Sequence, residues 1–221
     1  YATDDGWIRL HTNAAHHRRA AEHVLGACPD RNAMAAKVAS WAKDDLEQAV
    51  VDAGGCAAVM RSWQQWQVHP QGMAVNAEPL VHFVPREDER RHGGWGSVAR
   101  PLAGLKVLDL TRVLAGPAAS RFLAGLGADV LRIDPPHWHE PGVVAEMTLG
   151  KRCAHLDLHQ RQDRQVFEAL LKDADILLHG YRADALEALG YGARERQALA
   201  PGLIDVSLNA YGWSGPWQNR R

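Results

Sequence analysis

The chain has 221 residues, of which 46% are apolar, and a formal net charge of −1 at neutral pH. This length suits one large domain or two small ones, and the apolar content is sufficient for a packed core. A near-neutral chain lacks the basic stripe that marks nucleic-acid-binding proteins. No apolar run reaches the roughly 18 residues that indicate a membrane span. We therefore expect neither nucleic acid nor a membrane among its partners.

The cysteines and histidines argue against several kinds of site. Cys28, Cys56 and Cys153 are scattered and odd in number, which favours reduced thiols and a cytoplasmic location over a disulfide framework. The twelve histidines form no HExxH motif, and no CxxC pair completes a zinc site, so we expect no metal. The absence of a Gly-x-Ser-x-Gly elbow argues against an α/β-hydrolase.

Residues 1–83 read as a small, mainly helical α+β segment. Trp7–His11 alternates apolar and polar residues, which predicts a short strand. Asn13, Asp30 and Ser62 are candidate helix caps. The predicted helices run from Asn13 to Gly26, from Asp30 towards Trp41, from Lys43 to Ala53 and from Ser62 past Trp66, with a short apolar stretch at Ala57–Met60. Residues 84–101 are charged and then glycine-rich, which predicts a linker.

From Gly104 onward, short apolar runs alternate with helical patterns. The predicted strands are Leu105–Leu110, Asp129–Asp134, Ala154–Leu158, Asp175–Leu178 and Leu203–Leu208; the predicted helices are Ala118–Leu126, Asp163–Lys172, Ala183–Leu189 and Ala193–Leu199. Such alternation implies parallel pairing with right-handed crossovers. We therefore predict an α/β fold, with a Rossmann-like open, mostly parallel sheet and helices on both faces.

Three features of this half have both a binding and a structural interpretation. The loop Thr111–Pro117 leads from a strand into a helix, whose N-terminus favours an anion, but it lacks the G-x-G-x-x-G fingerprint. Asp134 ends the second strand, where a dinucleotide-binding fold holds a ribose hydroxyl; with Pro135–Pro136 following, we favour a strand terminator. Lys151 and Arg152 are either phosphate ligands or a solvated surface pair.

Six stretches in order carry a resemblance to a known family: Pro101–Pro117 (PLAGLKVLDLTRVLAGP), Leu123–Pro136 (LAGLGADVLRIDPP), Gly150–Leu158 (GKRCAHLDL), Ala174–Arg182 (ADILLHGYR), Leu189–Gly192 (LGYG) and Asn209–Pro216 (NAYGWSGP). Together they resemble the family III CoA transferases, the CaiB/BaiF family, which includes formyl-CoA transferase and alpha-methylacyl-CoA racemase relatives. The resemblance implies a CoA-binding Rossmann-like domain at 102–221.

Residues 1–83 resemble the smaller domain of the same family. Asp5–Leu10 (DGWIRL) is similar to its entry strand, and Ala53–Ala58 (AGGCAA) with His69–Gly72 (HPQG) is similar to a later region of that domain. In the usual order the small domain follows the nucleotide-binding one, whereas here it precedes it. We therefore expect the chain to be an internal piece of a longer enzyme.

The resemblance also implies where CoA lies, along the edge where the parallel strands end. Matching by position, the expected contacts are Val113, Leu114, Ala115, Pro135, Lys151, Arg152, Gly180, Tyr181 and Arg182. Three of these depart from the family pattern. Leu114 replaces a Gln of some transferases, Pro135 replaces an adenine contact, and Gly180–Tyr181 replaces an Asn-Phe pair.

In the family an Asp after the Gly-Pro turn attacks an acyl-CoA, giving a mixed anhydride and then an enzyme–CoA thioester. No Asp follows Asp205, which lies within a predicted strand, so we expect the nucleophile beyond Arg221 and this piece alone to be inactive. The implied substrates are acyl-CoA and a carboxylic acid, with no tightly bound cofactor, and the implied assembly is a homodimer.

Two alternatives stay open beside the transferase. A 2-methylacyl-CoA racemase needs a His base and an acid near the α-carbon, for which His137 or His139 is a candidate. A non-catalytic CoA- or nucleotide-binding module needs no nucleophile at all.

Overall fold

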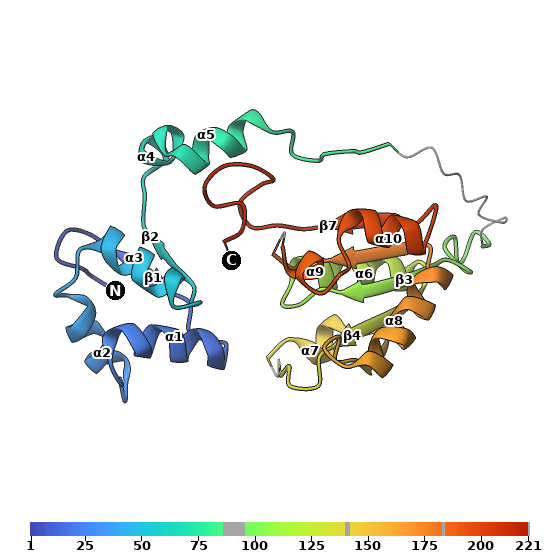
Figure 1. Cartoon of the computed structure of the whole chain (residues 1–221), viewed down its shortest axis with the longest axis horizontal. Coiled ribbons are helices and arrows are strands. Elements are labelled where there is room, and N and C mark those ends of the chain that lie inside the picture. The colour runs from blue at the N-terminus through green and yellow to red at the C-terminus, as the bar shows by residue number, and fades with distance from the viewer. Residues whose placement is uncertain (86–95, 140–141, 183, 221) are drawn as a thin grey trace. The chain divides into compact units, whose positions relative to one another are not determined.

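The computed structural model describes residues 1–85, 96–139, 142–182 and 184–220. They form two compact units: Tyr1–Ala77 with Ser214–Arg221, and Glu78–Trp213 (Figure 1). Each unit is described by itself. The domain limits expected from the sequence, 1–83 and 102–221, stay a prediction, and most of the predicted linker at 84–101 falls on residues 86–95, which lie outside the described residues.

The first unit is built around a two-stranded antiparallel sheet. β1 (Ile8–Leu10) pairs with β2 (Ala57–Val59), and buried side chains of both pack against Val38, Leu46 and Val50. The helices are α1 (Ala15–Leu25), α2 (Arg31–Val38), α3 (Lys43–Asp52), α4 (Trp63–Val68) and α5 (Pro70–Ala77). The small, mainly helical α+β segment predicted from the sequence therefore has its own core.

Two of the three predicted helix caps are confirmed. Asp30 accepts a hydrogen bond from the Ala33 amide, and Ser62 forms a capping box with Gln65. The Asn13 cap is wrong, because α1 begins one residue later and its cap, Ala14, makes no side-chain bond. Helix α5 escaped prediction because its sequence has no apolar period and contains a glycine.

The segment 214–217 packs on α5 of the same unit. The side chain of Gln71 is fully buried; its Nε2 donates to the Ser214 carbonyl at 2.8 Å and its Oε1 accepts from the Trp217 amide at 2.6 Å. A Cβ at Gly215 would lie 2.6 Å from Gln71 Oε1. The Gly215–Pro216 turn is thus held by the Gln of the His69–Gly72 motif.

The second unit contains a five-stranded parallel sheet of order β5-β4-β3-β6-β7. Figure 1 labels β3, β4 and β7 of this sheet. The strands are β3 (Lys106–Leu110), β4 (Asp129–Asp134), β5 (Arg152–His155), β6 (Ile176–His179) and β7 (Ile204–Ser207). The chain starts in the middle, runs outward to β5, returns to β6 beside β3 and ends at β7. This is the doubly wound order, so the predicted Rossmann-like α/β fold is confirmed.

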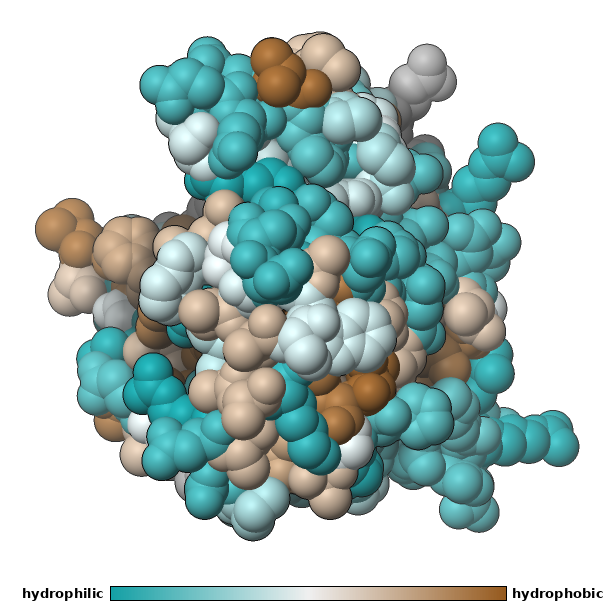
Figure 2. All heavy atoms as spheres, turned by 90° about the vertical axis from the view of Figure 1, so that its left-hand side faces the viewer, coloured by the Kyte–Doolittle hydropathy of each residue, from teal (hydrophilic) through white to brown (hydrophobic). Residues whose placement is uncertain are grey.

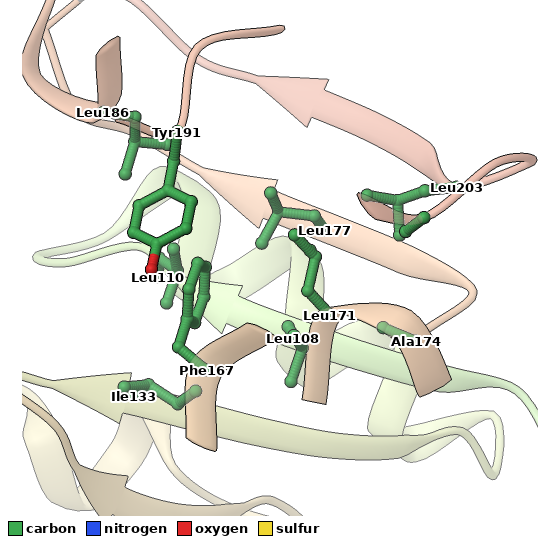
Figure 3. Packing of buried hydrophobic residues seen from close by; sticks show 11 residues of the cluster. Leu108, Leu110, Ile133, Phe167, Leu171, Ala174, Leu177, Leu186, Tyr191 and Leu203 are labelled. Atoms are coloured by element: carbon green, nitrogen blue, oxygen red, sulfur yellow. The ribbon is translucent and has the colours of Figure 1, made fainter. Parts of the chain in front are cut away.

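The central strand β3 is buried on both faces, because helices cover both faces of the sheet. Leu108 and Leu110 join the larger core, where Phe167 and Leu171 of α8 (Arg161–Asp173) pack, as Figure 3 shows. Val107, one step out of phase, packs on the other face with residues of α6 (Ala115–Gly125). The remaining helices are α7 (Val144–Met147), α9 (Ala185–Ala188) and α10 (Ala193–Leu199). Predicted helix limits shift little, except that α6 begins three residues early, at Ala115.

In the part of the chain that the structure describes, the surface and the cysteines add no further site. Within the described residues, no helix is long and apolar enough to cross a membrane. Cys28, Cys56 and Cys153 form no disulfide. The face drawn in Figure 2 mixes hydrophilic and hydrophobic residues.

Candidate functional site

The sheet has one topological switch point, between β3 and β6. The chain leaves β3 towards β4 on one side and leaves β6 towards β7 on the other, so the two connections diverge. Because Leu110 is paired with His179, the loops Thr111–Leu114 and Gly180–Arg182 leave the sheet at the same level. A crevice at this position is where open α/β sheets bind their ligands. The structure thus brings Val113, Leu114, Ala115, Gly180, Tyr181 and Arg182 to one edge.

The loop after β3 is strained at its centre. Val113 has φ of +66°, the only positive φ among non-glycine residues that the structure describes. A β-branched residue in this region is a genuine outlier, and such strain gathers at ligand sites. Val113 and Leu114 are also 55% and 57% exposed. The loop therefore presents apolar side chains to solvent instead of to the core.

The N-terminus of α6 follows this loop directly and packs tightly against its base. Gly116 is buried against Thr111; a Cβ there would lie 2.3 Å from Thr111 Cγ2. Only a glycine permits this approach. It brings the first turn of α6, with its unpaired N–H groups, beside the strained loop.

Arg112 is the centre of an aromatic cluster at the switch point. Its guanidinium carbon lies 4.8 Å from the ring centroids of both Trp138 and Tyr181, and its Nη2 donates to the Tyr181 hydroxyl at 2.7 Å. Cation–π contacts of this kind contribute roughly 0.5–2 kcal/mol each. The cluster joins the connections that follow β3, β4 and β6.

Asp134 is the anionic part of the same cluster. It is buried, and its carboxylate accepts a hydrogen bond from Arg132 Nε at 2.7 Å. The same carboxylate lies 3.5 Å from Nε of Arg112. Arg132 is itself only 1% exposed. Two guanidiniums therefore share this carboxylate. Guanidinium groups are the side chains best suited to bind phosphate oxygens.

A cavity of about 330 Å³ opens on the β4 and β5 side of this cluster. Its wall includes Arg132, Asp134, Trp138, His139 and His155. Within the described part of the chain, no three His, Cys, Asp or Glu side chains are placed to hold a metal ion.

The remaining predicted contacts lie in three different environments. Pro135 is half-buried at the end of β4. The Lys151 side chain is completely buried, with its ammonium bonded to Asp109, Pro117 and Ser120. Arg152 is exposed and pairs with Asp129 at the amino end of β4. The structure therefore does not bring the two neighbouring cations, Lys151 and Arg152, together.

Sequence reasoning missed Arg112, Arg132 and Trp138. A signal was present in β4, where Val130, Arg132 and Asp134 alternate with Leu131 and Ile133. Arg132 and Asp134 are two residues apart and so lie on the same face of a central strand. Buried charges on one face indicate that this face has a role besides packing in the core. Trp138 and Arg112 carried no such pattern, because their contact depends on loops that only the fold brings together.

Asp205 on β7 belongs to a second buried polar group. Arg196 of α10 donates to its Oδ2 at 2.8 and 2.6 Å, and His179 lies 3.3 Å from its Oδ1. Burial raises the pKa of Asp205, but the bonds from His179 and Arg196 outweigh it and hold that pKa below its usual value. This carboxylate is engaged in an ion pair that ties α10 to the sheet.

The chain is similar in sequence to known CoA transferases. The model of the family described as CoA-transferase family III matches residues 102–221. An acyl-CoA transferase of Gibberella moniliformis is 31% identical over 198 residues, covering 83% of this chain and 34% of that protein. Acetyl-coenzyme A transferase nodX of Hypoxylon pulicicidum is 41% identical over 129 residues, covering 56% and 22%.

Among solved structures, the D175A mutant of Rv3272 from Mycobacterium tuberculosis is 34% identical, with a TM-score of 0.50, covering 55% of this chain and 36% of that one. The chain spans about a third or less of the length of these relatives. The matched residues 102–221 include all six motifs, except the first residue of the first, and the loops at the switch point. The chain therefore belongs to CoA-transferase family III.

Proposed function

We propose that the loops at the switch point bind the CoA part of an acyl-CoA. The observation that carries the proposal is the placement of Arg112 between Trp138 and Tyr181, beside a strained, exposed loop. The guanidinium of Arg112 suits the phosphates of CoA, because it can donate several hydrogen bonds to phosphate oxygens. The aromatic rings suit its adenine, since base–aromatic stacking is favourable for any base.

Among the nine residues expected from the family, the geometry favours those at the carboxyl edge. Val113, Leu114 and Ala115 follow β3, and Gly180 and Tyr181 follow the neighbouring strand β6. We add Arg112 and Trp138 to them. The proposal assigns Lys151 an indirect part, because its ammonium already has three acceptors.

We further propose that the longer protein transfers CoA between carboxylic acids. An Asp carboxylate attacks the acyl-CoA carbonyl and releases the CoA thiolate, leaving an aspartyl mixed anhydride. The thiolate then attacks the aspartyl carbonyl of that anhydride, which frees the first acid and gives an aspartyl–CoA thioester. The acceptor carboxylate repeats the two exchanges in reverse. We propose that the nucleophile belongs to another part of the longer protein and that the residues described here contribute CoA binding.

Calorimetric titration of this chain with CoA tests the binding step. We expect saturable binding that weakens at least about tenfold when Arg112 is changed to Ala, because a charged and stacked contact is lost. Arg19→Ala, in the other unit, is the matched control and should leave the affinity unchanged. Absence of heat at millimolar CoA, with a folded chain, would show the binding proposal to be wrong.

One observation keeps the racemase as a second candidate: His139 lies in the wall of the cavity, where a base would have access to an acyl group. Incubating the longer protein with a 2-methylacyl-CoA in deuterium oxide separates the two reactions. A racemase incorporates deuterium at the α-carbon without an acceptor acid, whereas a transferase needs an acceptor and leaves the α-hydrogen in place. A further variant of the longer protein changes the proposed aspartate nucleophile to Ala. Loss of all CoA transfer in this variant, without loss of CoA binding, supports the transferase.

The assembly and the location follow from the same proposal. We propose a cytoplasmic homodimer for the longer protein, and light scattering that reports a monomer would contradict the dimer. A chain that binds CoA while the longer protein neither transfers nor exchanges would instead be the non-catalytic module.

A further inference from the structure

A buried polar network lies directly beneath the Thr111–Leu114 loop. Lys151 Nζ donates to Asp109 Oδ2 at 2.9 Å, to the Pro117 carbonyl at 2.9 Å and to Ser120 Oγ at 2.6 Å. The side chains of Lys151 and Asp109 are both 0% exposed. Three acceptors saturate the three protons of the ammonium, so this lysine has no donor left for a ligand.

Asp109 connects that ammonium to the loop. Its Oδ1 accepts from the Thr111 amide at 2.9 Å and also from the Thr111 hydroxyl, while its Oδ2 accepts from Ser120 Oγ at 2.5 Å. Thr111 is the first residue of the loop, and Pro117 and Ser120 lie in the first turns of α6. The network therefore makes hydrogen bonds to residues before and after Val113.

Lys151 reaches this position from a third element. Gly150, with φ of +77°, turns the chain from the α7 end into β5, and Lys151 projects from that turn under α6. Burial of an ion pair is costly unless its hydrogen bonds are complete. Here the hydrogen bonds of the ion pair are complete. They hold the two ends of the loop that contains Val113, the one strained non-glycine residue among those that the structure describes.

We propose that Lys151 is a positioning residue, whose buried ammonium holds the Thr111–Leu114 loop, through Asp109 and the start of α6, in the conformation that accepts CoA. This inference rests on the proposed CoA site. It separates Lys151 from Arg152, although the two are neighbours in sequence and carry the same charge: Lys151 acts through the loop, and Arg152 is 69% exposed beside Asp129.

Two readouts test the proposal: deuterium exchange of the loop amides, which needs no ligand, and calorimetric affinity for free CoA. Lys151→Met should speed exchange at the Thr111 amide and weaken CoA binding by about tenfold or more, since small misplacements of binding groups have effects of this size. Lys106→Met is the matched control. It makes the same substitution at the amino end of β3, where the exposed lysine pairs with Asp173, and should change neither readout.

Lys151→Met leaves the Asp109 carboxylate buried without its cation, so the variant risks unfolding. The double variant Asp109→Asn with Lys151→Met removes both charges, and Ser120→Ala removes one acceptor without leaving an unpaired charge. Both should speed loop exchange and weaken CoA binding, the second to a smaller extent. Leu171→Ala, in the core on the other face of the sheet, should lower stability without changing the affinity, which separates positioning from stability alone.

The results that overturn the proposal are specific. If Ser120→Ala and the double variant fold, and both keep wild-type loop exchange and a CoA affinity within about twofold, Lys151 does not position the loop. If the wild-type chain binds no CoA, the proposed function fails, and unchanged loop exchange in the same variants still decides against Lys151.

Discussion

Replacement of Gly116 by Ala should damage both the stability of the second unit and its affinity for CoA. The added Cβ would lie 2.3, 2.4 and 2.6 Å from three side-chain atoms of Thr111, where carbon atoms normally sit about 3.5–4.0 Å apart. The helix start or the loop must therefore move by about 1 Å or more. Overpacking of this kind costs roughly 1–3 kcal/mol, which exceeds the gain in helix propensity of up to about 1 kcal/mol.

Gly125→Ala is the matched control, because it makes the same change at the last residue of the same helix, α6. A Cβ at Gly125 meets nothing within 4 Å, so this variant should be neutral or more stable by up to about 1 kcal/mol. Urea unfolding followed by circular dichroism should separate the two variants by roughly 1–3 kcal/mol. If Gly116→Ala matched the wild type in both stability and CoA affinity, the tight contact between α6 and the loop would not matter.

Three other substitutions test separate parts of the chain. Arg196→Met should destabilise the second unit by about 3–5 kcal/mol by leaving the buried Asp205 without its cation, and adding Asp205→Asn should recover most of the loss in urea titrations. Glu47→Gln should lower stability at pH 7. Burial raises the pKa of Glu47, but the bonds from Arg61 and a backbone amide outweigh it and hold that pKa below its usual value, so the deficit should shrink as the pH falls below about 4. Arg112→Lys keeps the charge but loses the planar stack, and calorimetry should show a CoA affinity between those of wild type and Arg112→Ala.

The pH dependence of Glu47 depends on the sign of its shift. A carboxylate whose folded pKa is depressed stabilises the native state above its unfolded pKa of about 4.3, and that contribution disappears as the pH falls through the folded pKa. Unfolding titrations of wild type and Glu47→Gln at pH 7 and below pH 4 give the comparison. A deficit that is constant across this range would contradict the ion-pair explanation.

The sequence predicted four of the five strands of the second unit well, because each is a short apolar run between turn residues. The strand predicted at Ala154–Leu158 is displaced, because β5 spans Arg152–His155 and is a largely polar edge strand. It also predicted Val113, Leu114 and Tyr181 at one sheet edge, through the family resemblance and the parallel register. It did not separate Lys151 from Arg152, since neighbouring residues at the start of a strand point to opposite faces and only packing shows which face is buried. Helix α5 was missed for a related reason, because contacts with residues 214–217 stabilise it more than its own composition does.

The proposed CoA site lacks the glycine-rich turn that a dinucleotide fingerprint would supply. A fingerprint lets the backbone approach a diphosphate through glycines that adopt unusual dihedral angles. Here the unusual angle belongs to Val113, and in our proposal it is maintained by a buried carboxylate, a buried ammonium and one glycine, Gly116, placed where α6 touches Thr111. Removing any of these should relax the same loop. That is why Gly116→Ala and Ser120→Ala, which change unrelated contacts, are both expected to weaken CoA binding.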